Sequence, residues 1–501
     1  MSDQAGPRHL RGRFLFPLIT LALVLLLFAV LEGALSFFDV ADPESKTDPL
    51  VGFTEIRPLF ILNEAEGRYE TAPSRKIYFN FDTFAVQKPS NGFRIFCLGG
   101  STVAGRPYAI ATSFTKWLEI GLGAADPSRE WKVVNCGGVS YASYRLLPIL
   151  EEVLQYDPDF VILYTGQNEF LEDRTYDAIK HLPAYISKPL DIVSQFRTFT
   201  LLRSFFELSD KSKDPKNTLP TEVKAWLDYK DGLAQFKKDP VWRQGVVDHF
   251  DQNLRRMVHL SREAGVPILI VNPGCNLRDC PPFKSLPKEG LTAEERDRFQ
   301  SLIEEARESY HSDPNRSVAL LLEATEIDDQ NAAGFYELAK GYDAVGRVEE
   351  AFDAYDRAKE LDICPLRILD SMNRSILDLA SDESVPMVDA KTLLIGESED
   401  GIPGNDVYID HVHPTIGSHE KIANAIADKL IDLLGISPPD GWNEARDELF
   451  REHLASLDKV YFAKGLDRLK RLQSWAAGES DETPPISAPS ANQVRERTAS
   501  E

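Results

Sequence analysis

Short apolar runs that alternate with helical segments are the feature that most constrains the fold of this 501-residue chain. Helical periodicity separates these runs, and a long helix is predicted at 241–264 and a closing one at 416–434. Strands that alternate with helices form parallel sheets with helices on both faces. The sequence therefore predicts an α/β protein with a doubly wound parallel sheet, whose strands are expected at 93–98, 131–135, 159–164, 267–272 and 385–388.

The turn after the first predicted strand carries a candidate nucleophile. Gly99 and Gly100 allow the backbone to turn sharply and bring Ser101 to the carboxyl end of the strand, where open α/β sheets bind their ligands. Taken alone, the motif fits a simpler interpretation, a glycine turn that caps a helix, because serine favours turns and N-caps. A catalytic role for Ser101 therefore requires a base and oxyanion donors from later in the chain.

The loop before the closing helix supplies a candidate base. Asp410 stands three residues before His413, so its carboxylate can orient an imidazole that takes the serine proton. In a second interpretation His413 is a polar residue hydrogen-bonded to the backbone. In a third, His411, His413 and His419 form a metal site, although their spacing is not that of a zinc helix. The chain also has no paired Cys-x-x-Cys set, so we predict no metal and no cofactor.

Further polar turns offer donors for an oxyanion, which acyl transfer requires. These donors are the backbone N–H of Ser101, the N–H groups of the turn after the second strand, and the side-chain amide of Asn168 after the third strand. All of them fall at carboxyl ends of predicted strands, and this convergence favours one catalytic site over separate structural turns. The turn after the second strand contains Gly137, Gly138 and Ser140.

In this order, the motifs resemble the blocks of the SGNH (GDSL-like) hydrolase family, over about residues 91–290 and 370–435. The resemblance implies a flavodoxin-like sheet, Ser101 as nucleophile, Asp410 and His413 as the rest of a triad, and an oxyanion role for Asn168. The first, second, third and fifth blocks correspond to Gly99-Gly-Ser101-Thr102, Val134-Asn-Cys-Gly-Gly-Val-Ser-Tyr-Ala-Ser143, Gly166-Gln-Asn168-Glu169 and Asp410-His-Val-His413-Pro414.

Two positions depart from the family pattern. The family's Asp after the first glycine is Gly100 in this chain. The glycine of the second block aligns with Ser140, which keeps a backbone N–H but adds a side chain that would narrow the pocket.

An uncharged apolar run at 14–31 is long enough to cross a bilayer as a helix. Arginines precede it and acidic residues follow it, so the positive-inside tendency leaves the N-terminus in the cytoplasm. A cleaved signal peptide is the alternative, but the run is longer than usual and 33–36 is a poor cleavage site. We predict a cytoplasmic segment at 1–13, a single-pass membrane anchor at 14–38, and a catalytic domain in the periplasm or at the cell surface.

Charge and cysteine content narrow the choice of partners. The formal net charge of −23 argues against nucleic acid or anionic lipid as the main partner and favours neutral or cationic substrates.

Of the five cysteines, Cys97 and Cys136 lie in or beside apolar strands and are expected to be buried thiols. Cys275 and Cys280 flank a short loop and could form a disulfide in an oxidising compartment.

The hydrolase domain is expected at 91–290 and 368–440, with a connector before it at 39–90. Residues 171–240 include an apolar helical patch at 190–208, interpreted as extra scaffold, a lid or a second membrane contact. Residues 291–367 match the spacing of one tetratricopeptide repeat (TPR) and part of another, and are expected to pack on the sheet domain and to offer a surface for a protein partner. C-terminal helices at 441–478 and a disordered tail at 479–501 complete the chain.

These expectations combine into a membrane-anchored, extracytoplasmic serine esterase. The resemblance and the location suggest acyl or acetyl groups of envelope polysaccharide as substrate. The alternatives are an acyltransferase on the same fold, or a TPR-type binding or assembly protein with a degenerate hydrolase domain. Asn276 and Arg278, after the fourth strand, are predicted to bind substrate, since an arginine fork suits carboxylates and sugar hydroxyls. The alternative for Arg278 is a surface pair with Asp279.

Overall fold

The computed structural model describes residues 26–35, 50–172 and 217–479, together with residues 20, 23, 48, 174, 197, 198 and 201. The chain divides into two compact units, the first containing 1–52 and 175–218 and the second containing 53–174 and 219–501. Most of the predicted anchor (14–38), nearly all of the apolar patch (190–208) and residues 480–501 lie outside the described residues.

In the first unit, residues 26–35 are helical. The Glu32 carboxylate accepts hydrogen bonds from the Thr198 backbone N–H (2.9 Å) and hydroxyl (2.6 Å). Strands β1 (Val51–Phe53) and β8 (Asn217–Leu219) form a two-stranded sheet. Across the described residues of the whole chain, no helix combines the length and the apolar character needed to cross a membrane.

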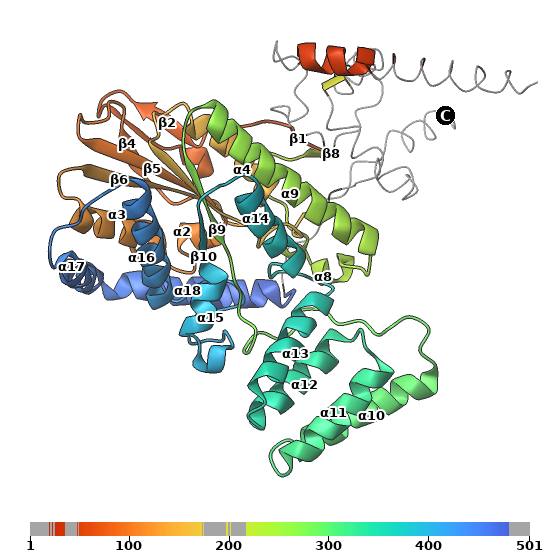
Figure 1. Ribbon diagram of the computed structural model, residues 1–501. Coiled ribbons are helices and arrows are strands. Elements are labelled where there is room, and N and C mark those ends of the chain that lie inside the picture. Colours follow the sequence, from red (N-terminus) through yellow and green to blue (C-terminus); the bar gives the residue numbers. More distant parts are fainter. Residues whose placement is uncertain are drawn as a thin grey trace, which may run out of the picture. The chain divides into compact units, whose positions relative to one another are not determined.

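The second unit contains the predicted parallel sheet (Figure 1). Its strand order is β10-β9-β7-β5-β6, so the first of these strands along the chain lies between the second and the third, as in flavodoxin-like sheets. All four strand pairs are parallel. The strands are apolar because helices cover both faces. They are β5 (Gly92–Gly99), β6 (Glu130–Gly137), β7 (Phe160–Tyr164), β9 (Ile268–Asn272) and β10 (Met387–Asp389), which confirms the predicted sheet.

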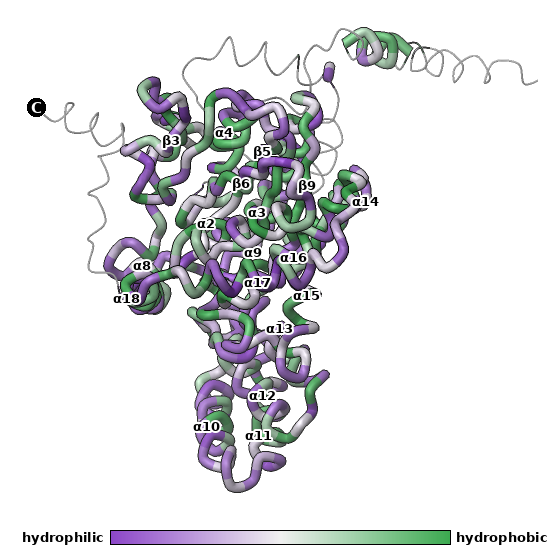
Figure 2. Tube along the Cα trace, turned by 90° about the vertical axis from the view of Figure 1, so that its left-hand side faces the viewer, coloured by the Kyte–Doolittle hydropathy of each residue, from purple (hydrophilic) through white to green (hydrophobic). Residues whose placement is uncertain are grey.

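Helices cover the two faces of this sheet in the expected alternation (Figure 1). On one face α3 (Phe114–Ala125) and α16 (Ile416–Leu433) pack together over a core that includes Trp117, Leu118, Ile422 and Ile426. Figure 2 shows hydrophobic colouring along β5, β9, α3 and α4. The other face carries α4 (Ser143–Val153), α9 (Pro240–Glu263) and α14 (Asp370–Asp382), and α15 (Ala390–Glu397) follows β10.

The part of the connector in the second unit contains strands, for which the sequence made no prediction. It forms an antiparallel sheet of β2 (Phe60–Asn63), β3 (Arg68–Thr71) and β4 (Thr83–Ala85). The rings of Phe60 and Phe84 meet that of Phe96 in β5 edge to face, with centroids 6.4 and 5.3 Å away. These strands of three or four residues are too short to show a period of two in the sequence.

The insert is built from helices, as predicted, which form two helix pairs between residues 293 and 361. The helices are α10 (Ala293–Ser309), α11 (Pro314–Ile327), α12 (Ala332–Ala344) and α13 (Val348–Leu361). Leu302, Leu321 and Leu338 from these helices share one apolar core with Leu277 after β9 and Val412 in the loop before α16. The helical insert therefore packs directly against the loop that carries His411 and His413.

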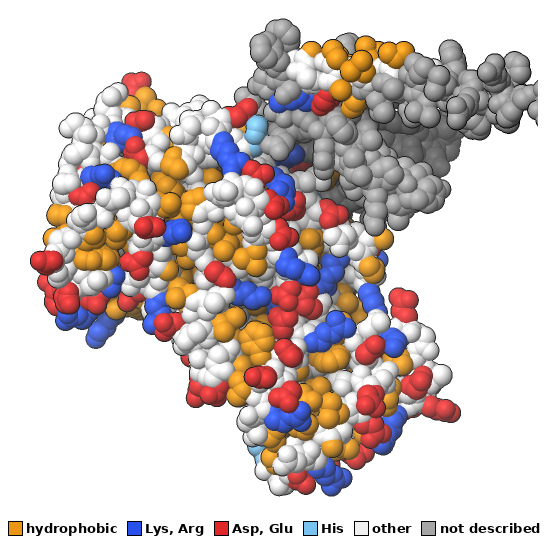
Figure 3. All heavy atoms as spheres, viewed as in Figure 1, with side chains coloured by type: hydrophobic (Ala, Val, Ile, Leu, Met, Phe, Trp, Pro, Cys, Tyr) orange, Lys and Arg blue, Asp and Glu red, His pale blue; other side chains and the backbone are white. Residues whose placement is uncertain are grey.

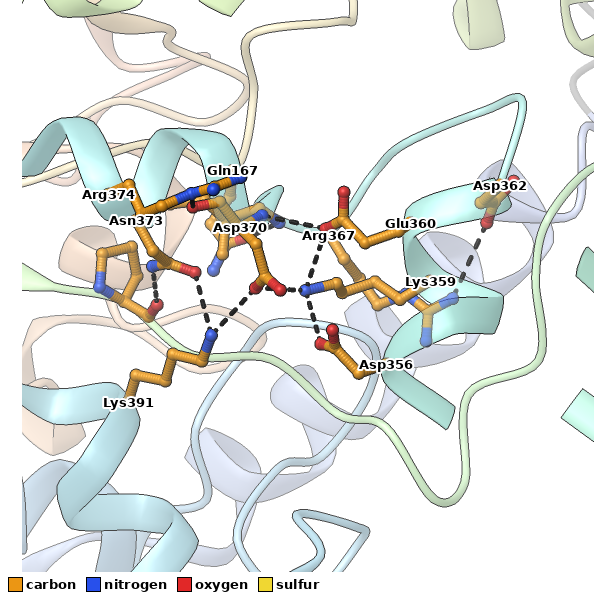
Figure 4. A network of polar contacts seen from close by, with 12 residues as sticks. Gln167, Asp356, Lys359, Glu360, Asp362, Arg367, Asp370, Asn373, Arg374 and Lys391 are labelled. Carbon is orange, nitrogen blue, oxygen red and sulfur yellow. Dashed lines mark hydrogen bonds and ion pairs between the residues drawn. The ribbon is translucent and has the colours of Figure 1, made fainter. Parts of the chain in front are cut away.

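A buried network of charges also joins the insert to the sheet domain (Figure 4). The Lys359 ammonium, on α13, lies 2.8 Å from Asp356, 3.1 Å from Glu360 and 2.9 Å from Asp370 at the start of α14. Lys391 on α15 reaches the same Asp370 oxygen at 2.9 Å. Lys359 is 2% exposed, while its acidic partners and Lys391 keep 22–35% of their side-chain surface exposed, so the cluster links three helices around one buried ammonium group.

The C-terminal helices α17 (Trp442–Ser456) and α18 (Lys459–Ala476) belong to the same unit. Helix α18 packs on the segment that follows Ser101: the Tyr461 hydroxyl contacts Thr112 at 2.8 Å, and Arg468 donates to the Tyr108 carbonyl at 2.8 Å. Its far end is tied to η3 (Trp226–Asp228), where the Trp475 indole donates to Asp228. On the face drawn in Figure 3, acidic and basic side chains are interspersed.

Candidate active site

The sharp turn after β5 places Ser101 at the first position of the short helix α2 (Ser101–Ala104). A Cβ at position 99 would lie 2.1 Å from the Tyr164 carbonyl oxygen, so only glycine allows β5 and β7 to end this close together. Ser101 therefore stands at the carboxyl edge of the sheet beside the end of β7, as predicted.

Ser101, His413 and Asp410 form a continuous hydrogen-bonded chain. The His413 Nε2 atom lies 2.7 Å from Ser101 Oγ, and Nδ1 lies 2.7 Å from Asp410 Oδ2. Because an ionised carboxylate can only accept, Nδ1 carries the proton and Nε2 is left to accept the serine proton. The three residues predicted as a triad are thus brought together in the order that nucleophilic catalysis requires.

The Asp410 carboxylate is buried but stays ionised. Burial alone would raise its pKa, but the neighbouring rings of His413 and His411, with hydrogen bonds from His413 and Val412, hold that pKa well below its usual value. The other oxygen, Oδ1, accepts the backbone N–H groups of Val412 and His413, both at 2.9 Å. The same side chain therefore folds the loop and orients the imidazole.

Asn276 and Arg278 support this loop rather than line the cavity. The Asn276 side-chain amide donates to the Asp410 carbonyl (3.2 Å), and its backbone N–H donates to the His411 carbonyl (3.0 Å). The Arg278 guanidinium pairs with Asp343 of α12 through bonds of 2.9 and 3.2 Å, and not with Asp279. The structure does not bring either side chain to the serine, because both are already bound within the protein.

The two cysteines of this loop are free and buried. The Cys280 Sγ atom points to the Pro281 carbonyl at 3.6 Å, and burial raises the pKa of its thiol to about 12. The disulfide considered for Cys275 and Cys280 is not formed.

The predicted oxyanion donors fall into two groups. The Gly137 N–H donates to the Asn135 side chain (3.1 Å) and the Gly138 N–H donates to the Gly99 carbonyl (2.9 Å), so both are occupied. The backbone N–H groups of Ser101 and Ser140 have no acceptor among the described residues. These two remain available to a ligand.

Ser140 occupies a conformation that suits glycine, with a φ of 62°. The turn therefore places residue 140 in the left-handed region with serine as its side chain. Asn168 donates to the Tyr141 carbonyl (3.0 Å) with one amide hydrogen and keeps a second. A Cβ at position 100 would lie 2.5 Å from the Asn168 amide nitrogen, so Gly100 gives Asn168 its space beside the serine.

A cavity of about 300 Å³ opens over these groups. Its lining contains the nucleophile, the base and the donors Ser140 and Asn168, and it includes residues that sequence reasoning missed. For Arg106 the sequence does hold an indication of a place near the active site, because it follows Ser101 by only five residues. For the residues of α18 it holds none, because the spacing of apolar residues along a helix does not show where that helix packs. The missed residues with polar or aromatic side chains are Arg106, Gln167, Arg468, Arg471 and Trp475.

The three histidines considered as metal ligands each contact other groups of the protein. Both ring nitrogens of His413 are engaged, and His411 Nδ1 lies 3.5 Å from Asp410. The His419 ring accepts the Phe114 N–H at 3.3 Å and stacks on the Phe114 side chain. Within the described part of the chain, no three His, Cys, Asp or Glu side chains are grouped as metal ligands.

No protein-family model and no curated protein matches this chain. Solved structures do resemble it. A lipase/acylhydrolase from Enterococcus faecalis is 12% identical, with a TM-score of 0.31, over 70% of this chain and 99% of that chain. A catalytic mutant of Axe2, an acetylxylan esterase from Geobacillus stearothermophilus, is 13% identical with a TM-score of 0.31, over 69% and 96%. A lipolytic protein of the G-D-S-L family from Veillonella parvula is 10% identical with a TM-score of 0.30, over 67% and 97%.

Likenesses this weak carry no conclusion about chemistry, which rests on the atoms of the site. The doubly wound sheet and the Ser101–His413–Asp410 chain together define a serine hydrolase site on an α/β fold.

Proposed function

We propose that this protein is a serine esterase of SGNH type. The single observation that carries the proposal is the pair of 2.7 Å contacts that link Ser101 to His413 and His413 to Asp410 at the edge of a cavity. A serine hydroxyl is a weak nucleophile, and a neutral imidazole within hydrogen-bond reach is what activates it.

The proposed reaction has two halves. Ser101 Oγ attacks the ester carbonyl while His413 Nε2 takes its proton, and the ionised Asp410 stabilises the imidazolium that forms. The developing oxyanion is held by the N–H groups of Ser101 and Ser140 and by the Asn168 amide. The imidazolium then protonates the leaving alcohol, and water, deprotonated by the same nitrogen, releases the acyl group from Ser101.

We assign the protein a short acyl ester and an extracytoplasmic location at the membrane. A cavity of about 300 Å³ stands at the small end of ligand pockets, which favours acetyl over long acyl chains.

The uncharged run at 14–31, with arginines before it, supports a membrane anchor with the catalytic domain outside, where acetylated envelope polysaccharide would be the substrate. An alkaline phosphatase fusion after residue 45 should be active in a bacterial host. High activity of a cytoplasm-only reporter at that point would reverse the proposed topology.

Labelling with a fluorophosphonate tests the catalytic proposal. Wild-type protein should be labelled, Ser101→Ala should not, and Ser128→Ala, a change of an exposed serine, should be labelled as wild type. Labelling that survives in Ser101→Ala would remove Ser101 from the role of nucleophile.

Two other functions use the same features. An acyltransferase would pass the acyl group to a sugar hydroxyl, so adding an alcohol acceptor should divert product from free acid. A binding or assembly protein would use the helical insert, which we propose to be of TPR type, and would show no labelling at Ser101. The intact hydrogen-bonded triad favours an enzyme over this last alternative.

A further inference from the structure

The catalytic cavity is lined by a cluster of cations. Arg106 follows α2, and Arg468 and Arg471 lie on α18, and all three line the same cavity as Ser101 and His413. No Asp or Glu side chain is among the residues that line it. In a chain with a net charge of −23, this concentration of positive charge beside the nucleophile is a local exception.

The protein itself leaves much of this charge unneutralised. Among the described residues, neither Arg106 nor Arg468 has a carboxylate within ion-pair distance, and Arg468 donates only to the carbonyls of Pro107 (3.4 Å) and Tyr108 (2.8 Å). Arg471 pairs with Asp467 at 2.9 Å, but both side chains are more than 60% exposed, so solvent screens that pair.

The guanidinium of Arg106 lies in an environment that disfavours its positive charge. Its Nε atom is buried and has no hydrogen-bond partner in the described structure. Burial, together with the neighbouring charges of Arg468 and Arg471, lowers the pKa of its guanidinium to about 10. Neighbouring like charges are unfavourable, and one carboxylate or phosphate group in the cavity would offset the repulsion among them.

We propose that the arginine cluster of Arg106, Arg468 and Arg471 binds an oxyanion, a carboxylate or a phosphate, that the ester substrate carries near its scissile bond. The inference rests on the proposed esterase function and specifies its substrate class. The planar fork of arginine suits both anions, which accept two parallel hydrogen bonds. The negative charge of the whole chain, which favours neutral or cationic substrates, does not govern this pocket.

Matched acetyl esters test the proposal by kinetics. In 4-acetoxybenzoate and 4-acetoxyphenyl phosphate an anion accompanies the ester, and 4-acetoxybenzamide is the neutral counterpart. Wild-type kcat/KM should be about 10-fold or more higher for at least one anionic ester than for the amide, mainly through KM. Comparing the two anionic esters shows which anion is preferred. In Arg106→Gln and Arg468→Gln this ratio should fall towards one.

Lys470→Gln is the matched control, because it removes one positive charge from the exposed side of the same helix and does not line the cavity. It should keep the wild-type ratio. A ratio near one in wild type, or an equal fall of the ratio in Lys470→Gln and Arg468→Gln, would overturn the proposal.

Binding to the inactive Ser101→Ala protein separates this proposal from the esterase function. By calorimetry, this variant should bind the preferred anionic ester at least 10-fold more tightly than the amide, and adding Arg468→Gln should remove the difference. If the wild type hydrolyses none of the esters but this preference holds, the esterase function fails and the anion site stands. Equal affinity for the anionic esters and the amide would overturn the anion site, even with full esterase activity.

Discussion

Arg278 and Asp343 form a two-bonded ion pair that joins the loop after β9 to the helical insert, with Nε–Oδ2 and Nη2–Oδ1 distances of 2.9 and 3.2 Å. Both side chains are largely buried, at 16% and 23% exposed. The loop that carries Arg278 also holds the Asp410 carbonyl through Asn276. The pair is therefore a connection between the insert and the support of the triad.

We expect Arg278→Ala and Asp343→Ala to be coupled in a double-mutant cycle. The coupling in the free energy of unfolding should be about 1 kcal/mol or more, because the pair is charge-assisted and partly shielded from water. The Arg298–Glu323 pair, inside the insert and about half exposed on both sides, should show a coupling below about 0.5 kcal/mol. Denaturant unfolding of the variants measures both, and equal couplings would contradict the special role of the buried pair.

Exchanging His413 for Asn should lower the rate of aryl acetate hydrolysis by about a thousandfold or more, because His413 Nε2 is the ring nitrogen that contacts Ser101 Oγ in the described part of the chain. His411→Asn should keep the greater part of the activity, since the His411 ring lies 3.5 Å from Asp410 Oδ1, and it is the other oxygen, Oδ2, that orients His413. Circular dichroism should show both variants folded. A comparable loss in the two variants would mean that the assignment of the base to His413 alone is wrong.

At position 140, glycine should be tolerated and valine should not. With a φ of 62°, Ser140→Gly removes the strain of a left-handed serine but gives the unfolded chain more freedom, so its stability should stay within about 1 kcal/mol of wild type. Ser140→Val should lose more than about 1 kcal/mol, since β-branched residues are strained there. Because Ser140 lines the cavity, Ser140→Gly should also improve turnover of longer acyl esters relative to acetate. Thermal melts and an acyl-length series check both expectations.

The buried histidines should make stability depend on pH in the acid range. Burial lowers the pKa of His419 to about 3 and that of His411 to about 4. In the unfolded chain each ring binds a proton near pH 6.5, so at lower pH the unfolded state holds more protons and gains stability. The stabilisation is complete above pH 6.5 and is lost as the pH falls towards about 3.

His419→Gln, which keeps a hydrogen-bond acceptor without a titrating ring, should therefore flatten the fall of the melting temperature between pH 6.5 and 4. His311→Gln changes an exposed histidine of the insert and serves as the control. Parallel curves for wild type and His419→Gln would contradict the prediction.

The parts that sequence reasoning predicted depend on local signals. The strand β5, the turn at Gly99 and the spacing of Asp410 and His413 are each encoded within a few residues, and the parallel sheet aligns their ends. The sequence predicts a substrate-binding role for Arg278, whereas its side chain pairs with Asp343. This pair is not visible in the sequence, because Asp343 is 65 residues away in a separate set of helices. The N–H groups of Gly137 and Gly138 were counted as donors, but Asn135 and Gly99 already accept them, which the sequence does not show.

Helix α18 is a second case in which the sequence predicts an element but not its contacts. Its amphipathic pattern predicts a helix, but not that Arg468 would reach the carbonyl oxygen of Tyr108 and line the cavity of Ser101. Long-range docking of this kind depends on shape and on partners spread along the chain. Local propensity and periodicity contain no information on either.

The separation of 312 residues between Ser101 and His413 has a consequence for the newly made protein. Ribosomes add about 5 to 20 residues per second, so the base emerges roughly 15 to 60 s after the nucleophile. During that interval Ser101 has no activating partner, and the arginines of α18 follow later still. The chain can therefore hydrolyse no ester through this site until its synthesis has passed His413 and the loop around that residue has reached Ser101.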